Sequence, residues 1–176
     1  CERTGAKLRW FDITDDGQLD LDKAEREGLI NEHTKVVSLA LASNVLGTIN
    51  PVQRIAQWAH QVGAVVVVDA SQAVPQMPVD VTELGVDLLA FTGHKMLGPT
   101  GIGILWGRYD LLDDLPPFLG GGEMIEVVRM TGSTYAKPPH RFEAGTPPIA
   151  QLTALAVAAD YLDEVGMAAI AQREHR

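Results

Sequence analysis

The sequence predicts an α/β fold with a mixed, mostly parallel sheet flanked by helices. Apolar runs alternate with segments of helical periodicity, as strands and helices do along a parallel sheet. The runs 35–42, 65–68 and 87–91 are mostly apolar, which is typical of strands buried on both faces. Only residues 92–101 separate the third run from the strand expected at 102–106. Because a parallel crossover usually needs a dozen residues or more, we expect this fourth strand to be antiparallel to the third.

Local signals predict the remaining elements. A proline favours the first helical turn, and Pro51 begins a segment whose apolar stripe ends near Gly63. The other expected elements are a short strand at 8–11, a charged surface helix at 21–30, a helical turn at 81–85, an irregular or hairpin-like segment at 123–148 and a long Ala/Leu helix at 149–165.

Composition and charge exclude several classes of function. Of the 176 residues, 46% are hydrophobic and 21% are charged, which suits one domain with a substantial core. The net charge of −9 and the lack of a basic cluster exclude nucleic acid and anionic membranes as expected partners. No apolar stretch approaches the ~20 residues of a bilayer span, and no signal peptide is visible. The single cysteine, Cys1, excludes a disulfide framework and a cysteine metal cluster, so we expect a cytoplasmic protein without a metal site.

Both ends of the sequence predict an internal piece of a longer protein. The chain begins without methionine, at Cys1-Glu2-Arg3-Thr4-Gly5, as though leaving a helix. It closes at 168–176 in a helical pattern that lacks a stop signal. No internal linker divides it, so we expect residues 1–176 to belong to one domain.

Lys95 is the most informative residue of the sequence. It follows the apolar run 87–91 and is flanked by glycines, a setting that suits an amine held in a cleft. A partly desolvated lysine loses its proton more readily and can attack an aldehyde. Asp69 ends the earlier run 65–68. An amine and a carboxylate in these positions predict a pyridoxal-phosphate site, with Lys95 forming the Schiff base and Asp69 pairing with the pyridine nitrogen. The ordinary alternatives are an exposed loop lysine and a capping aspartate.

Further polar groups follow the same strand ends, where the ligands of open α/β sheets collect. Each also has an ordinary structural explanation, as a strand-ending, surface or loop side chain. Gln72 could hydrogen-bond to the ring's phenolate oxygen, and Asn44 could bind the phenolate side of the ring or the substrate carboxylate. Thr92 and His94 could bind the phosphate, and His94 could instead relay a proton. Ala70 could contact the face of the ring.

Two glycine- or threonine-containing segments complete the set of candidates. Thr146 precedes the helix expected at 149–165, where a hydroxyl and free amides can meet a phosphate; an ordinary capping threonine is the alternative. Gly101-Ile102-Gly103 lacks the strand-then-helix context of a dinucleotide fingerprint. We expect these glycines to permit a tight entry into the fourth strand.

Taken in order, the motifs are similar to those of a known family. They are Asp69-Ala70-Ser71-Gln72, Gly93-His94-Lys95, Gly98-Pro99-Thr100-Gly101-Ile102-Gly103, Gly120-Gly121-Gly122-Glu123-Met124-Ile125 and Arg141-Phe142-Glu143-Ala144-Gly145-Thr146-Pro147. The sequence resembles the SUF-type cysteine desulfurases, with the selenocysteine lyases, of the class V aminotransferase group. The resemblance covers nearly the whole chain.

The resemblance implies a fold-type I pyridoxal-phosphate enzyme, with residues 1–176 forming most of its large, cofactor-binding domain and with an N-terminal part and a C-terminal small domain lying outside. It implies that Thr146 reaches the phosphate of the partner subunit, and hence a homodimer. The other matched positions are Lys95 for the Schiff base, Asp69 for the pyridine nitrogen, Gln72 for the phenolate oxygen, Thr92 and His94 for the phosphate, and Asn44 near the ring and substrate. In this role Lys95 also moves the Cα proton.

The implied reaction converts L-cysteine to L-alanine and leaves a persulfide on an enzyme cysteine. The sulfur then passes to an acceptor protein for iron–sulfur cluster assembly. Cys1 does not match the family's persulfide cysteine. The arginine with which the family binds the substrate carboxylate has no counterpart here, so the chain alone is expected to be inactive. Two alternatives stay open: another class V enzyme (an aminotransferase or a selenocysteine lyase), or a non-catalytic dimerization or scaffold module.

Overall fold

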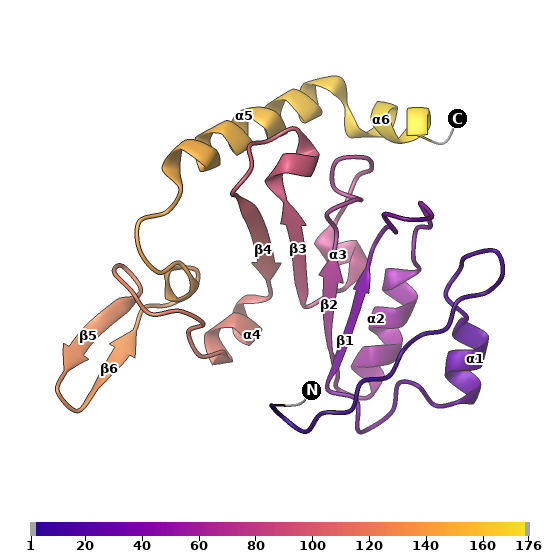
Figure 1. Ribbon diagram of the computed structural model, residues 1–176, viewed down its shortest axis with the longest axis horizontal. Helices are drawn as coiled ribbons and strands as arrows, with labels where there is room; N and C mark the ends of the chain where they lie inside the picture. The colour runs from indigo at the N-terminus through magenta and orange to yellow at the C-terminus, as the bar shows by residue number, and fades with distance from the viewer. Residues whose placement is uncertain (1–2, 175–176) are drawn as a thin grey trace.

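The computed structural model describes residues 3–174, and a four-stranded sheet lies at the centre of their fold (Figure 1). The strands are β1 (Val36–Ala40), β2 (Val65–Asp69), β3 (Leu88–Thr92) and β4 (Gly103–Gly107), in that spatial order. The first three are parallel and β4 is antiparallel to β3. The structure therefore confirms the predicted mixed sheet and the direction of its fourth strand.

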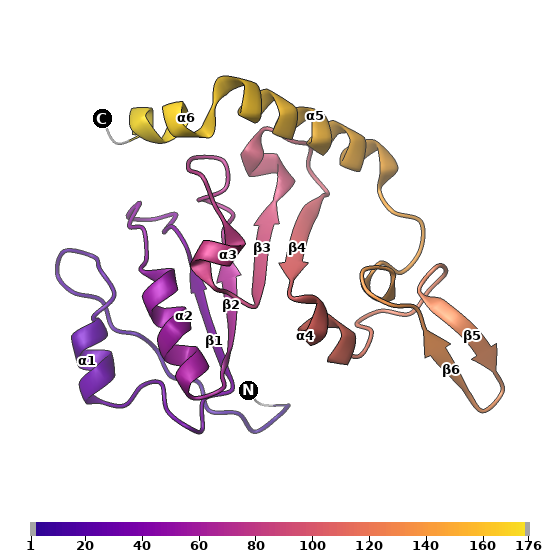
Figure 2. The same cartoon turned by 180° about the vertical axis from the view of Figure 1, so that it is seen from behind.

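Helices cover one face of this sheet. α2 (Val52–Gln61) buries Ile55, Ala56 and Ala59 in the main core. Figure 2 shows α2 and the short α3 (Val81–Leu84) in front of the strands. The buried strand residues alternate along the chain, as one face of a strand requires; they are Val37, Val66, Val68 and Leu89.

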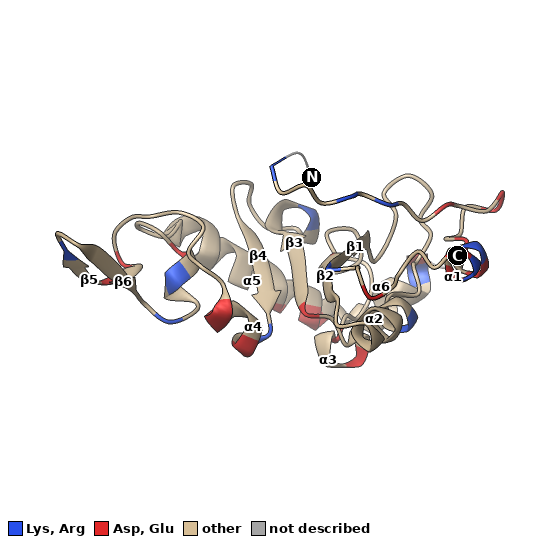
Figure 3. Cartoon of the chain, turned by 90° about the horizontal axis from the view of Figure 1, so that it is seen from below, with Lys and Arg blue, Asp and Glu red and all other residues tan. Residues whose placement is uncertain are grey.

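The opposite face of the sheet is open among residues 3–174. Figure 3 shows the helices α2 and α3 below the strands and no helix above them. Val36 and Leu105 are both 58% exposed. The expectation that these strands are buried on both faces is therefore wrong for the described residues, because only one face has a helical cover.

Two consecutive helices cross the carboxyl end of the sheet (Figure 1). α5 (Ile149–Val165) confirms the predicted range and is followed by α6 (Met167–Glu174). Leu155 and Leu162 of α5 pack in a small core with Met96, next to Lys95. α5 therefore supports the segment that carries the candidate lysine.

The segment after β4 projects away from the sheet. α4 (Tyr109–Asp114), which the sequence did not predict, leads to a hairpin of β5 (Ile125–Arg129) and β6 (Gly132–Tyr135). The hairpin confirms one of the two forms expected for 123–148. Arg141 secures its base: the guanidinium donates to the Ala136 carbonyl at 3.0 Å and pairs with Asp113 at 3.2 Å.

Two expectations near the N-terminus are wrong. Residues 8–11 form no strand and pair with none of the strands described; Leu8 is 59% and Trp10 74% exposed. α1 (Leu21–Arg26) is shorter than expected because Gly28 adopts a φ of +55°. Arg9 then donates to the Gly28 carbonyl at 2.8 Å, which satisfies an acceptor beyond the helix end.

A buried carboxylate joins four elements at the edge where the parallel strands begin. Asp87, just before β3, is 3% exposed. Its Oδ2 accepts from the Val66 backbone N–H and lies 2.8 Å from Nε2 of His60 at the end of α2. Its Oδ1 accepts from Arg108 Nη1, just after β4, at 2.8 Å. This network fixes α2, β2, β3 and β4 relative to one another.

Candidate active site

The predicted polar groups lie at the carboxyl edge of the three parallel strands. Asp69 and Thr92 are the last residues of β2 and β3, and Asn44 follows β1. His94 and Lys95 lie on a 3-10 helix, Gly93–Met96, directly after β3. Parallel strands bring these ends to one edge, which confirms the expected convergence.

Asp69 and Thr92 also project from the same face of the sheet. Asp69 is in register with Ala40 on β1 and Ala90 on β3, and Thr92 lies two residues beyond Ala90. Residues two apart on a strand share a face. That face is the open one, and the two alanines beside Asp69 leave room above its carboxylate.

Asp69 is held in its ionised form. Hydrogen bonding from Ser71 lowers the pKa of Asp69 most, and the positive charge of Lys95 lowers it further. The Ser71 backbone N–H donates to Oδ1 at 2.8 Å. An ionised carboxylate here can accept a hydrogen bond from the N–H of a protonated pyridine ring.

The turn that carries Lys95 depends on glycine. A Cβ on Gly93 would lie 2.8 Å from Ile102 Cγ2, and one on Gly98 would lie 2.9 Å from the Gly93 carbonyl oxygen. Gly93 and Gly98 therefore allow the chain to turn sharply after β3, in the segment that carries Lys95. The expected cleft is not formed by residues 3–174, however: Lys95 is exposed, because nothing described covers the open face at this edge.

The glycines at the start of β4 act as predicted. Gly101 has a φ of +79°, and a Cβ on Gly103 would lie 2.9 Å from the Phe91 carbonyl oxygen. The chain therefore enters the antiparallel strand through a turn that a larger residue would strain.

Thr92 and His94 contact each other. Thr92 Oγ1 lies 2.7 Å from Nδ1 of the His94 imidazole. The side chains of the two candidate phosphate ligands thus contact each other directly. Their positions two residues apart in the sequence did not predict this contact.

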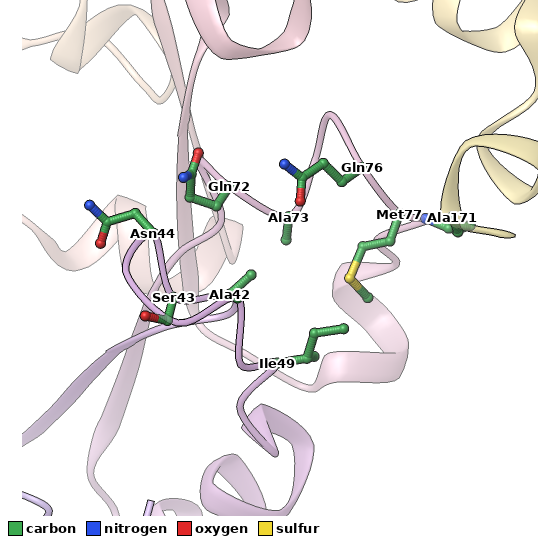
Figure 4. A pocket seen from close by; sticks show the side chains of 11 residues that line it. Ala42, Ser43, Asn44, Ile49, Gln72, Ala73, Gln76, Met77 and Ala171 are labelled. Carbon is green, nitrogen blue, oxygen red and sulfur yellow. The ribbon is translucent and has the colours of Figure 1, made fainter. Parts of the chain in front are cut away.

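Asn44 and Gln72 meet in a pocket of about 420 Å³ (Figure 4). Their carboxamides lie on one side, and Ile49, Met77 and Ala171 of α6 lie on the other. The sequence did not single out Gln76 or Met77, whose side chains only the loop after β2 brings here. Asp69 and Lys95 do not line this pocket. The described residues therefore form a pocket lined by polar and apolar side chains, and the candidate amine and carboxylate lie outside it.

Thr146 and Ala70 do not join the other candidates. Thr146 lies two residues before Pro148, the N-cap of α5, and that cap has no side-chain hydrogen bond, so a capping role for Thr146 is wrong. Its segment runs between the hairpin and α5, beyond β4 (Figure 1). Ala70 is 0% exposed, so contact with a ring face is also wrong; the small residues beside Asp69 are Ala40 and Ala90.

Ser71 is a site residue that the sequence analysis missed. An aspartate whose side chain accepts the backbone N–H two residues on forms an Asx turn, and the segment 69–72 carries that signal.

Two classes of site have no support within residues 3–174. No group of three or more histidine, cysteine, aspartate or glutamate residues there could hold a metal ion. None of the helices in this range is long and apolar enough to cross a bilayer.

Comparison with known proteins establishes the family. Residues 1–176 match the family described as aminotransferase class-V. The chain belongs to this family. Among curated relatives, a probable cysteine desulfurase of Streptomyces coelicolor is 63% identical over 99% of the chain, and a cysteine desulfurase of Haloferax volcanii is 51% identical over 95%. The chain spans 41% and 39% of the length of these two relatives.

Solved structures agree with this assignment. The chain is similar to the apo structure of a cysteine desulfurase from Thermococcus onnurineus, with a TM-score of 0.91 and 40% identity over 99% of the chain and 43% of that structure. The cysteine desulfurase CsdA of Escherichia coli gives a TM-score of 0.87 at 38% identity, over 92% of the chain and 40% of that structure. These likenesses confirm the fold class.

The cofactor of this family is pyridoxal phosphate. The donor set fits it: an ionised carboxylate with an alanine on each neighbouring strand, a lysine amine and a histidine–threonine pair lie at one edge. The structure places Asn44, Asp69, Gln72, Thr92, His94 and Lys95 after the carboxyl ends of the parallel strands, with Asn44 and Gln72 in one pocket and Thr92 in contact with His94.

Proposed function

We propose that the chain forms most of the cofactor-binding domain of a SUF-type cysteine desulfurase. The relatives named cysteine desulfurase support this, as does a solved structure of SspA in complex with cysteine, 25% identical with a TM-score of 0.73. The observation that carries the proposal is the Asp69 carboxylate at the end of β2, which accepts from the Ser71 N–H at 2.8 Å and lies between Ala40 and Ala90 on the open face of the sheet.

Each residue has a defined task in this proposal. Lys95 supplies the amine that holds the cofactor covalently, and later moves the proton at the substrate Cα. Asp69 accepts the N–H of the pyridine ring and keeps that nitrogen protonated. The bound cofactor supplies an electron sink for the pair left at Cα. The remaining ligands are Gln72 and Asn44 beside the phenolate oxygen and substrate, and Thr92 and His94 at the phosphate.

The net reaction transfers sulfur from L-cysteine to an enzyme thiol. The Cβ–S bond of the substrate breaks as the sulfur bonds to a cysteine thiolate of the enzyme. L-Alanine leaves after Cβ gains a proton, and the enzyme carries a persulfide. No residue of 3–174 supplies this thiolate, and Cys1 lies outside the described residues.

The proposal extends to the assembly. Thr146 reaches the phosphate in the partner subunit of a homodimer; its segment runs between the hairpin and α5, beyond β4 (Figure 1). The persulfide sulfur passes to an acceptor protein for iron–sulfur cluster assembly in the cytoplasm.

The test is product analysis of the full-length protein with pyridoxal phosphate, L-cysteine and a reductant. We expect equal amounts of alanine and sulfide. A 2-oxo acid without sulfide would indicate an aminotransferase, and turnover of selenocysteine alone would indicate a lyase. Cofactor binding without any product would favour a scaffold role.

We expect Asp69→Asn to lower turnover by roughly 10²- to 10³-fold, the usual loss when one preorganised electrostatic group is removed. The amide keeps the acceptor for the Ser71 N–H, so the free energy of unfolding should change little. Asp80→Asn is the control, because Asp80 caps α3 and asparagine caps equally well. Turnover of Asp69→Asn equal to the wild type would show that the carboxylate is not the electronic partner of the ring.

A further inference from the structure

We propose that Thr48 is a positioning residue for Asn44. Both residues lie in the loop 43–48 that follows β1, and the Thr48 hydroxyl joins this loop to a turn near the N-terminus, at Gly17. This inference rests on the proposed function, in which Asn44 binds beside the phenolate oxygen and the substrate. It gives a task to the segment 13–19, which contributes no candidate ligand itself.

The position of Asn44 depends on the loop that carries it. Figure 4 shows Ser43 and Asn44 on this loop, near Gln72. The Asn44 side chain is exposed, so packing does not hold it. The Ser43 N–H donates to the Thr48 carbonyl at 2.9 Å and closes the base of the loop. At the tip, the Ser43 hydroxyl accepts from the N–H groups of residues 45 and 46, both at 3.2 Å. The loop therefore has a defined backbone, and its orientation depends on what it contacts.

The loop contacts the turn at 13–19. The Thr48 hydroxyl donates to the Gly17 carbonyl at 3.0 Å, from a position 31 residues further along the chain. A carbonyl oxygen only accepts, so the direction of this hydrogen bond is fixed. Gly17 has a φ of +78°, and a Cβ on it would lie 2.7 Å from Leu46 Cδ1. Glycine therefore permits both the tight turn and the close approach of Leu46.

The turn is in its own right attached to the main core. Ile13 and Leu19 form an antiparallel bridge across it, and the Gly17 N–H donates to the Thr14 carbonyl at 2.9 Å. Leu19 packs against the core cluster, and Leu21, at the start of α1, is buried in it. The Thr48–Gly17 hydrogen bond thus fixes the loop that carries Asn44 to a segment that the core holds.

The first test measures this attachment without cofactor, by hydrogen exchange of the full-length protein read by peptide mass spectrometry. Thr48→Val keeps the β-branched shape and removes the donor. We expect it to speed exchange of the 43–47 amides about fivefold, the equivalent of one modest hydrogen bond, and Thr48→Ser to resemble the wild type. Thr153→Val is the matched control, because it removes a hydroxyl-to-carbonyl bond of the same 3.0 Å length within α5. It should leave exchange at 43–47 unchanged.

The second test asks whether Thr48 acts through Asn44. We expect Thr48→Val to lower kcat/KM for L-cysteine about fivefold, with Thr48→Ser and Thr153→Val close to the wild type. In an Asn44→Ala background, Thr48→Val should cause no further loss, because a positioning residue acts only through the group that it places.

Three results would overturn the inference. They are unchanged exchange at 43–47 in Thr48→Val, unchanged kcat/KM in that variant, and a loss of kcat/KM that is equally large in the Asn44→Ala background, which indicates a general structural role. If the wild type forms neither alanine nor sulfide, the proposed function fails, while the exchange result still decides whether Thr48 holds the loop.

Discussion

Lys95→Ala should lower desulfurase turnover of the full-length protein by about 10³- to 10⁴-fold. The substitution removes both the amine that holds the cofactor and the group that moves the Cα proton, and a positioned proton carrier alone contributes up to about 10⁴-fold. The measurement is alanine release at saturating L-cysteine. Since Lys95 is exposed, we expect the free energy of unfolding to stay close to that of the wild type.

Lys35→Ala is the matched control. Lys35 is also exposed, but it precedes β1 at the opposite edge of the sheet, and only its backbone carbonyl is used, as the acceptor for the Val65 N–H. Its turnover should equal that of the wild type. Equal activity in Lys95→Ala and Lys35→Ala would show that chemistry does not depend on the lysine after β3.

Asp87→Ala should lower the free energy of unfolding by about 1–3 kcal/mol, the usual cost of leaving a buried donor without its acceptor. The variant leaves the buried Val66 N–H without its acceptor and Arg108 and His60 without their shared carboxylate. Urea unfolding measures the loss. Asp110→Ala is the control, because Asp110 pairs with the same Arg108 while exposed to solvent, and it should change stability little.

The same carboxylate gives a pH dependence of known sign. Burial raises the pKa of Asp87, but hydrogen bonds from Val66, His60 and Arg108 outweigh it, so the folded pKa lies below the ordinary value. The stabilisation is therefore complete above about pH 4, the unfolded value, and is lost as the pH falls through the folded value. The stability difference between the wild type and Asp87→Ala should shrink below about pH 4. A difference that stays constant to lower pH would contradict the network.

Local sequence predicted the fold well where one signal decided the outcome. The short 92–101 connection set the direction of β4, and the Ala/Leu run gave α5 its observed range. The strand expected at 8–11 failed because apolar residues make a strand only with a hydrogen-bonding partner, and the described residues offer none there. α4 was missed because six residues carry too little periodicity.

The candidate site was predicted as a set of strand ends, and its internal geometry was not. Sequence order placed Asp69 and Thr92 at one edge, whereas their shared face depends on the register of β2 and β3. The Thr92–His94 contact and the Asp87 network are side-chain contacts that no motif encodes. Lys95 is exposed because no described segment covers the open face. Composition and motif spacing do not predict which segments cover a sheet face.

The account depends most on one lysine amine that holds the cofactor beside the Asp69 carboxylate. Incubating the protein with pyridoxal phosphate, reducing with borohydride and mapping the adduct by peptide mass spectrometry tests this most directly. We expect one dominant adduct, on Lys95, that is absent in Lys95→Ala and retained in Lys35→Ala. Adducts spread over several surface lysines, with the same pattern in Lys95→Ala, would contradict the account.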